Sequence, residues 1–225
     1  MKTCLSYYAI KKKTRVDTMY LYQSLGEITS QIIDTPHKIP VKTPFGIPFI
    51  SVNYMLNFPD TNFYIDKAKE GLEYVDPDEG IEFMKRFTPE KGDILFSKWG
   101  TPGVAKLINT SEKFLGSCSL ALIKSLTLKV NSFYLVYLLN SPIVRKQVDL
   151  LSLTSTRTEI HIGHIENLKI LLPSLPEQQE IAQILQTIDQ KIEIKKKKKE
   201  LYEELFKTML NKLMTGETKV NNISL

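Results

Sequence analysis

The residues whose types could bind a metal ion or act as nucleophiles stand apart from one another in this sequence. His161 and His164 lie three positions apart in "EIHIGHIE". In a strand that spacing directs the two imidazoles to opposite faces, which is poor geometry for holding one metal ion. Cys4 and Cys118 lack a neighbouring base that would activate a thiol. We therefore expect ordinary histidines and cysteines, with no metal site and no nucleophile.

The carboxylates and glycines also lack the spacing of an enzyme motif. The sequence has no glycine-rich phosphate or cofactor loop, and no Asn/Asp-Pro-Pro-aromatic motif of an adenine-type aminomethyltransferase. Pro59-Asp60 and Pro77-Asp78 are the nearest starts to a nuclease motif, but neither is followed by an acid, any residue and a lysine. Both pairs are more simply interpreted as turns. The sequence predicts no catalytic site.

Three polar segments instead have the composition of nucleic-acid contacts. "HKIPVK" (37–42) offers lysines for phosphates, and "SKWGTPG" (97–103) carries a lysine, an indole and hydroxyls on a glycine-proline turn. "TSTRTE" (154–159) surrounds an arginine with hydroxyls, which suit phosphates and base edges. The predicted DNA-binding residues are Lys38, Lys42, Lys98, Trp99, Thr101, Thr154, Ser155, Thr156 and Arg157.

These assignments have structural alternatives that the sequence leaves open. Trp99 is the only tryptophan, and its simpler interpretation is a packing residue at the core or its rim. Segment 154–159 is equally interpreted as a capped turn with a solvent-facing arginine.

Composition sets broad limits on the class of protein. The 225 residues are 42% hydrophobic and 24% charged, which is ordinary for a globular chain. Two cysteines form no disulfide framework and fit a reducing cytoplasm. No run approaches the ~18 apolar residues of a membrane span. The net charge is +5, and about four of these charges lie in the first 176 residues, because the helical segment after them nearly balances its lysines with acids.

The order of the patterns predicts an α+β fold. "GIPFISVNYM" (46–55), "KGDILFSKWGTPGVAKLI" (91–108) and "CSLALIKSL" (118–126) are typical of strands and hairpins. "VNSFYLVYLLNSPIVRKQVDLL" (130–151) has helical spacing broken by "NSP", and 153–173 is typical of a loop, a turn and a final strand. We expect a leader of unknown role at 1–20, a mixed globular domain with antiparallel strands at 21–176, a long helix at 177–215 and a tail at 216–225.

The stretch "LLPSLPEQQEIAQIL" (171–185) predicts an abrupt change from strand to helix. Pro173 ends the strand, Pro176 is tolerated in the first helical turn, and Ser174 with Glu177 matches a capping box. At 1.5 Å per residue, the helix would be roughly 55 Å long. Its apolar seam has the alternating four-three spacing of a coiled coil. The seam residues are Ile181, Leu185, Ile188, Ile192, Tyr202, Phe206, Met209 and Leu213.

Five consecutive lysines, 195–199, interrupt that seam. The simpler interpretation is a solvated run balanced by Glu193, Glu200, Glu203 and Glu204. The alternative is that Lys195 and Lys199 set the register of pairing or meet an acidic partner.

The ordered motifs resemble the specificity subunits of type I restriction–modification enzymes. They are "YQSLGEI" (22–28), "GIPFISVNYM", "KGDILFSKWGTPGVAKL" (91–107), "TEIHIGHIENLKILLPSLPEQQEIAQILQTIDQKIE" (158–193) and "LMTGE" (213–217). Members of that family usually carry two target recognition domains, each followed by a long helix, whereas this chain holds one of each. It resembles either a half-length subunit that pairs with a copy of itself or the product of a truncated or rearranged reading frame.

The resemblance implies a non-catalytic, cytoplasmic DNA reader. Its globular domain would read one half of a bipartite double-stranded target, and its helix would form a homodimer and dock methyltransferase subunits. S-adenosylmethionine, and the ATP and Mg²⁺ of a restriction or translocase subunit, would bind to those partners and not to this chain. The alternative function is a scaffold or inactive half-subunit, whose helix mediates assembly without independent DNA recognition.

Overall fold

Strand β10 (Leu120–Ser125) runs through the largest sheet of the protein. The computed structural model describes residues 21–37, 40–58, 62–63, 65, 70–152 and 158–218. Antiparallel strands β2 (Thr29–Asp34) and β7 (Ile94–Ser97) flank β10, followed by β8 (Ala105–Ile108) and, parallel to it, β5 (Asn62–Phe63). The first four residues of β10 are all buried, which explains why its sequence is a continuous apolar run.

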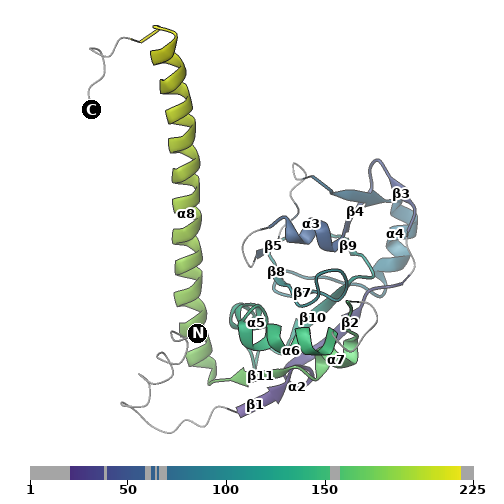
Figure 1. The fold of residues 1–225 in the computed structure, drawn as a ribbon. Helices are drawn as coiled ribbons and strands as arrows, with labels where there is room; N and C mark the ends of the chain where they lie inside the picture. The colour runs from purple at the N-terminus through teal and green to yellow at the C-terminus, as the bar shows by residue number, and fades with distance from the viewer. Residues whose placement is uncertain are drawn as a thin grey trace, which may run out of the picture. The chain divides into compact units, whose positions relative to one another are not determined.

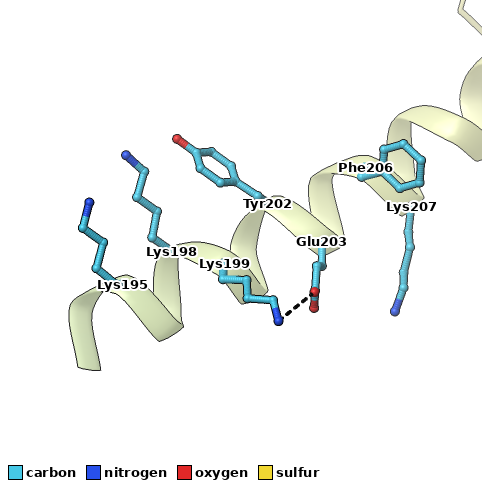
Figure 2. Close-up of a pocket in the computed structure, with 7 residues that line it drawn as sticks. All are labelled: Lys195, Lys198, Lys199, Tyr202, Glu203, Phe206 and Lys207. Atoms are coloured by element: carbon cyan, nitrogen blue, oxygen red, sulfur yellow. Dashed lines mark ion pairs between the residues drawn. The ribbon is translucent and has the colours of Figure 1, made fainter. Parts of the chain in front are cut away.

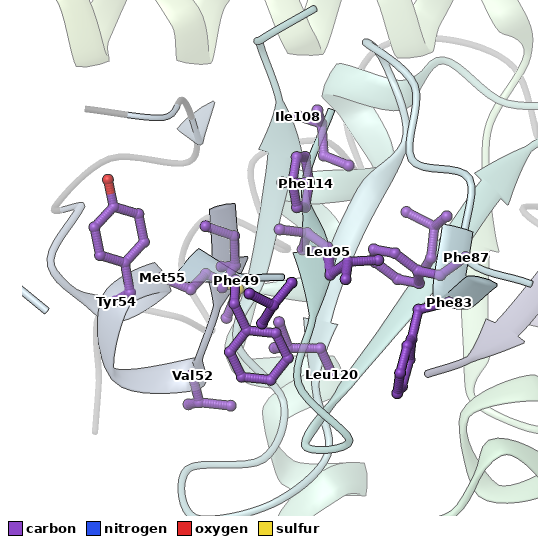
Figure 3. Packing of buried hydrophobic residues seen from close by; sticks show 14 of the residues in the cluster. Phe49, Val52, Tyr54, Met55, Phe83, Phe87, Leu95, Ile108, Phe114 and Leu120 are labelled. Atoms are coloured by element: carbon purple, nitrogen blue, oxygen red, sulfur yellow. The ribbon is translucent and has the colours of Figure 1, made fainter. Parts of the chain in front are cut away.

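A second sheet shares the hydrophobic core with the first (Figure 3). Its order is β3 (Lys42–Thr43), β6 (Glu73–Val75), β4 (Ile47–Ile50) and β9 (Leu115–Gly116), with β4 and β9 parallel. The core cluster takes side chains from both sheets, among them Phe49 of β4, Leu95 of β7 and Leu120 of β10. The predicted α+β class and the largely antiparallel pairing are therefore confirmed.

The predicted hairpin and the predicted helical break are both present (Figure 1). Segment 91–108 forms β7 and β8, joined by the glycine-proline loop. Segment 130–151 forms α5 (Ser132–Leu139) and α6 (Pro142–Ser152). Asn131 caps α5 by accepting a hydrogen bond from the Tyr134 N–H at 3.0 Å. Pro142 begins α6, where its missing N–H costs no helical hydrogen bond.

Short helices are where the sequence-based prediction was wrong. Segment 46–55 is a strand only through Ile50, because Ser51 accepts a hydrogen bond from the Tyr54 N–H at 3.1 Å and begins α3 (Val52–Leu56). Pro77-Asp78 is the first turn of α4 (Pro77–Met84), capped by the Asp76 carboxylate, and not an isolated turn. Pro59-Asp60 lies outside the described residues. The remaining short helices are α2 (Leu25–Ile28) and α7 (Ile162–Glu166).

The predicted change from strand to long helix is confirmed at the prolines. Strand β11 (Lys169–Leu172) pairs antiparallel with β1 (Leu21–Ser24) and ends before Pro173. Helix α8 (Leu175–Met214) begins two residues later, with Pro176 in its first turn. At the other end Gly216 has a φ of 75°, and its N–H donates to the Leu213 carbonyl at 3.2 Å. A positive φ favours glycine, so Gly216 supplies the backbone conformation that ends the helix.

The first turn of α8 is held by the fully buried side-chain amide of Gln178. Its Oε1 accepts from the Asn131 N–H at 2.9 Å, and its Nε2 donates to the Pro173 carbonyl at 2.9 Å and the Lys129 carbonyl at 3.2 Å. These bonds satisfy the three backbone groups beside it, and the sequence motif gave no sign of this role. The chain divides into two compact units after this residue, Met1–Gln178 and Gln179–Leu225.

No helix among the described residues is long and apolar enough to cross a membrane.

We expect Gln178→Ala to destabilise the protein, because it leaves three buried backbone groups without their partner. Each unsatisfied group costs about 1–3 kcal/mol, so the total loss in the free energy of unfolding should be at least ~2 kcal/mol. Urea unfolding followed by circular dichroism measures it. Gln179→Ala changes the same residue type one position later, at an exposed site, and should have little effect. Equal losses for the two variants would contradict the anchoring role of Gln178.

Candidate functional site

Lys98, in the second of the three predicted DNA-binding segments, is bonded to three other parts of the chain. Its backbone N–H donates to the Ser119 carbonyl at 2.7 Å, and its carbonyl accepts from the Ile160 N–H at 3.1 Å. Its ammonium forms an ion pair with Asp34, at the end of β2. The Lys98 side chain is 3% exposed, whereas that of Asp34 is 39% exposed. One residue of the hairpin loop is thereby bonded to Asp34, Ser119 and Ile160, which lie in three separate parts of the chain.

Ser97 and two glycines shape the loop that carries Trp99 and Thr101. The Ser97 hydroxyl donates to the Thr101 carbonyl at 2.5 Å and accepts from the Val104 N–H at 2.9 Å. Gly103 has a φ of 89°, and a Cβ there would stand 2.9 Å from the Val148 Cγ1 of α6. Glycine is therefore required both by its backbone conformation and by the close approach of the helix. The loop tip is held in one shape by groups beneath it.

Trp99 links the hairpin loop to the end of segment 154–159, the arginine loop. Trp99 and Glu159 form an isolated antiparallel β-bridge. Thr154, Ser155, Thr156 and Arg157 lie outside the described residues, but the chain re-enters the described part at 158, next to this bridge. Their assignment as DNA contacts stays a prediction.

The first polar segment reaches the same region through His37 and Lys42, and Asp34 lies three residues before it. The second oxygen of Asp34 lies 3.5 Å from the His37 Nε2, and the His37 ring centroid is 6.3 Å from that of Trp99. Lys42, 55% exposed, forms an ion pair with Glu73 at 2.5 Å. Lys38 is outside the described residues.

Lys42, Trp99 and Thr101 line one depression with a volume of about 350 Å³. We call it the Trp99 depression. Its walls also include α3 and the turn at 117–119 that precedes β10. The structure thus brings together three of the predicted DNA-binding residues. The Lys98 side chain is buried, and its ammonium forms an ion pair with Asp34. The structure therefore favours a positioning role for Lys98 over direct contact with DNA. The sequence missed this because Asp34 is 64 positions away.

The two histidines are closer together than their sequence predicted. His161 precedes α7 and is not in a strand, so the prediction of opposite faces is wrong. Its ring centroid is 5.6 Å from that of His164, and the His161 N–H donates to the His164 Nδ1 at 3.4 Å. Among the described residues, no group of three His, Cys, Asp or Glu side chains is placed to bind a metal ion.

The predicted seam of α8 is part of a wider exposed apolar band. Ile188, Ile192, Tyr202 and Phe206 are 46–67% exposed, whereas Ile181, Leu185, Met209 and Leu213 are half-buried. Leu201, Leu205 and Leu210, which the four-three spacing left out, are 47–63% exposed. A helix side this apolar and this exposed is typical of a surface that packs against another helix.

The lysine run of α8 is partly neutralised within the helix (Figure 2). Lys199 lies 3.7 Å from Glu203, and Lys197 lies 3.7 Å from Glu193. The Lys198 ammonium lies 5.3 Å from the centre of the Tyr202 ring. These contacts favour the solvated interpretation of the run. The hollow between these side chains has walls from one helix only, so it is an open part of the apolar band and not a ligand cavity.

Comparison with known proteins assigns both parts of the chain to one domain family. The family model described as the type I restriction modification DNA specificity domain matches residues 25–204. That range covers the two sheets, the Trp99 depression and most of α8.

Individual relatives agree with the family model. The type I restriction enzyme MjaVIII specificity subunit of Methanocaldococcus jannaschii is 38% identical over 96 residues, 43% of this chain and 23% of the relative. The putative MjaX specificity subunit of the same organism is 39% identical over 101 residues, 45% of this chain and 23% of the relative.

The fold also matches a solved structure. The crystal structure of the type I restriction–modification system S subunit from M. genitalium superposes with a TM-score of 0.57 at 16% identity, covering 90% of this chain and 48% of that one. The chain therefore spans about half of that structure, and its match covers under a quarter of the two curated relatives.

Because Lys98 is more buried than Asp34, we expect the loss of either partner to lower the free energy of unfolding by a different amount. Asp34→Ala leaves a buried ammonium unpaired and should lower the free energy of unfolding by on the order of 2–3 kcal/mol, less than the ~3–5 of a fully buried pair. Lys98→Met keeps most of the packing and leaves a carboxylate that water can reach, so its cost should be smaller, on the order of 1 kcal/mol.

Urea unfolding of the two variants measures both costs. The exposed pair between Lys85 and Glu82 supplies the control, since Glu82→Ala should change stability little. A greater loss for Lys98→Met than for Asp34→Ala would contradict the assigned burial and return Lys98 to the candidates for direct DNA contact.

Proposed function

The chain belongs to the family of type I restriction modification DNA specificity domains, and on that premise we propose that it is a sequence-specific DNA-binding subunit with no catalytic site of its own. The observation that carries the proposal is the convergence of the predicted DNA-binding segments. Lys42, Trp99 and Thr101 stand around one depression, and Trp99 forms a β-bridge with Glu159, the last residue of segment 154–159. Hydroxyls, a lysine and an indole on rigid turns are the groups that contact phosphates and base edges.

The chain would read one half of a bipartite target. Its described residues form one sheet body and one long helix, and the chain spans about half of the S subunit from M. genitalium that it matches. A second copy, joined through α8, would supply the other half-site. Because two identical readers are related by two-fold symmetry, the complete target would be a pair of inverted half-sites with a fixed spacer.

Helix α8 would serve both that pairing and the docking of methyltransferase subunits, with a restriction or translocase subunit as a further partner. The exposed apolar band supports this role, because a band of this kind needs a partner to remove it from water. The methyltransferase would bind S-adenosylmethionine, and the translocase would bind ATP and Mg²⁺. The chain's own contribution would be to select the sequence and hold the partners at a set distance from it.

The lysine run limits how two copies can pair. Parallel pairing, or antiparallel pairing centred on 195–199, would bring the lysines of both copies together. An antiparallel register centred between residues 200 and 201 would instead place Lys197 opposite Glu204 and Lys198 opposite Glu203 of the partner copy. Opposite charges beside an apolar seam select register, so we favour this antiparallel arrangement.

Deleting and restoring the gene in its host tests the reader function. We expect methylation of one bipartite motif to disappear on deletion and return on restoration, with inverted half-sites around a fixed spacer. Sequencing that detects methylated adenine measures it. A motif with two unrelated half-sites would contradict self-pairing while leaving DNA reading intact.

A gel-shift assay then separates a reader from a scaffold. The chain alone should bind DNA weakly and in a salt-sensitive way, because phosphate contacts release counterions. With methyltransferase subunits the binding should sharpen to the motif. If DNA is bound in neither case while the complex still assembles, the chain is a scaffold.

Charges placed on the band should prevent assembly without unfolding the sheet body. We expect Leu185→Asp combined with Ile188→Asp to abolish pairing, because two carboxylates would be buried in an apolar interface. Light scattering measures the mass, and circular dichroism checks the fold. Gln183→Asp combined with Gln190→Asp adds the same charge on another side of the helix, at exposed positions, and should leave the mass unchanged.

A further inference from the structure

The Trp99 depression has an apolar floor and a polar rim. Phe49 and Val52, each 8% exposed, contribute the floor, and Trp99 contributes an aromatic wall. Hydroxyls of Ser51, Thr101 and Ser119 line the rim. The side chain of Asn53, in the first turn of α3, is exposed at the same rim. Asn53 is the one side-chain amide among the described lining residues.

The charged groups at this depression neutralise each other. Lys42 and Glu73 both line it, and their side chains form an ion pair at 2.5 Å. A free lysine or arginine is the group that reads guanine, and a free carboxylate is the group that reads cytosine. In this ion pair each of those groups is already engaged by the other. A phosphate contact by Lys42 is compatible with this ion pair, because an ammonium has three N–H donors, but a direct reading of guanine by Lys42 or of cytosine by Glu73 is not favoured while the pair is formed.

One hydroxyl of the lining has unused hydrogen-bonding capacity. The Ser117 Oγ is buried and forms no hydrogen bond with any described residue. Its backbone is fixed, because the Ser117 N–H donates to the Ile50 carbonyl at 2.9 Å and its carbonyl accepts from the Thr35 hydroxyl at 2.7 Å. Because this Oγ is itself buried, a base that enters the depression does not reach it, and the groups available for reading a base are the exposed ones.

The groups that remain available match an A·T pair. An asparagine amide forms two hydrogen bonds with the N6 and N7 of adenine, and apolar side chains contact the methyl group of thymine. We propose that the Trp99 depression receives the major-groove edge of one A·T pair of the half-site, with the Asn53 amide on the adenine and the thymine methyl against Trp99 and Phe49. This inference rests on the proposed function, since it names the base pair that the DNA reader takes at this position.

Selection from a randomised double-stranded library tests the assignment. The full chain is produced with the methyltransferase subunits of its source cell, and bound sequences are read out. We expect one position that requires A·T in the wild-type complex to lose about tenfold of its preference in Asn53→Ala, because one bidentate contact accounts for discrimination of that size. Preferences at the other positions should stay the same.

Asn109→Ala provides the matched control, because Asn109 is exposed and lies outside the described lining of the depression. It should leave every position unchanged. If Asn53→Ala gives the wild-type motif, the inference falls while the proposed function stands. If the wild-type complex selects no motif, both fall. If the position altered by Asn53→Ala is a G·C pair, the assignment to A·T is wrong.

Modified bases test the contacts in the wild-type complex, where folding of a variant is not a concern. At the identified position, 7-deazaadenine removes the N7 acceptor, and uracil in place of thymine removes the methyl group. Each should weaken wild-type binding severalfold, and 7-deazaadenine should have no further effect on Asn53→Ala. Wild-type binding that is unchanged by both modifications would overturn the proposal.

Cys118 offers an independent readout, because it is a partly exposed free thiol in the lining. In a Cys4→Ser background, the specific DNA should slow alkylation of Cys118 at least severalfold compared with an equal concentration of a scrambled duplex. Equal alkylation rates with the two duplexes would show that DNA does not cover the depression.

Discussion

The arrangement of the predicted recognition surface depends on how Lys98 is bonded. Its N–H, its carbonyl and its ammonium each bind a different part of the chain: Ser119, Ile160 and Asp34. A buried charge without a partner is costly, so the ammonium draws the end of β2 to the hairpin loop. The backbone bonds fix the turn before β10 and the segment after the arginine loop. A cationic side chain that composition assigns to DNA is therefore used to assemble the surface on which other side chains are displayed.

The first turn of α8 relies on the same kind of interaction, made by a neutral group. The Gln178 amide supplies one acceptor and one donor group to backbone groups that β11 and the segment before α5 leave unpaired. Pro173 contributes by ending the strand and by presenting a carbonyl to Gln178. Prolines explain why the strand stops and why a helix is tolerated at once, and Gln178 explains why the first helical turn stays in place. The "PEQQE" sequence therefore combines a helix start with a buried attachment point.

Long periodic patterns made much of this fold predictable, and distant pairings made the rest unpredictable. Helix α8, the β7–β8 hairpin, β10 and the α5–α6 break follow from spacing, proline and glycine, which act locally. Helices α3, α4 and α7 were missed because a few residues carry too little periodicity. Single capping groups, Ser51 for α3 and Asp76 for α4, begin two of these helices. Lys98 looked like a DNA contact because its partner Asp34 is remote in sequence. The apolar band of α8 was underestimated because strict four-three spacing leaves out Leu201, Leu205 and Leu210.

The structure separates buried residues that hold the predicted recognition surface in shape from exposed residues that line the Trp99 depression. Ser97, Lys98 and Gly103 are buried, and each is fixed by hydrogen bonds, an ion pair or a positive φ. Asn53 and Thr101 are exposed on turns beside them, so substitutions there change the chemistry of the Trp99 depression without removing a core contact. Under the proposed function, a change of sequence preference would therefore require few residues and little loss of stability. The same separation applies to α8, where the exposed band shares no residue with the depression, so altered reading need not alter assembly.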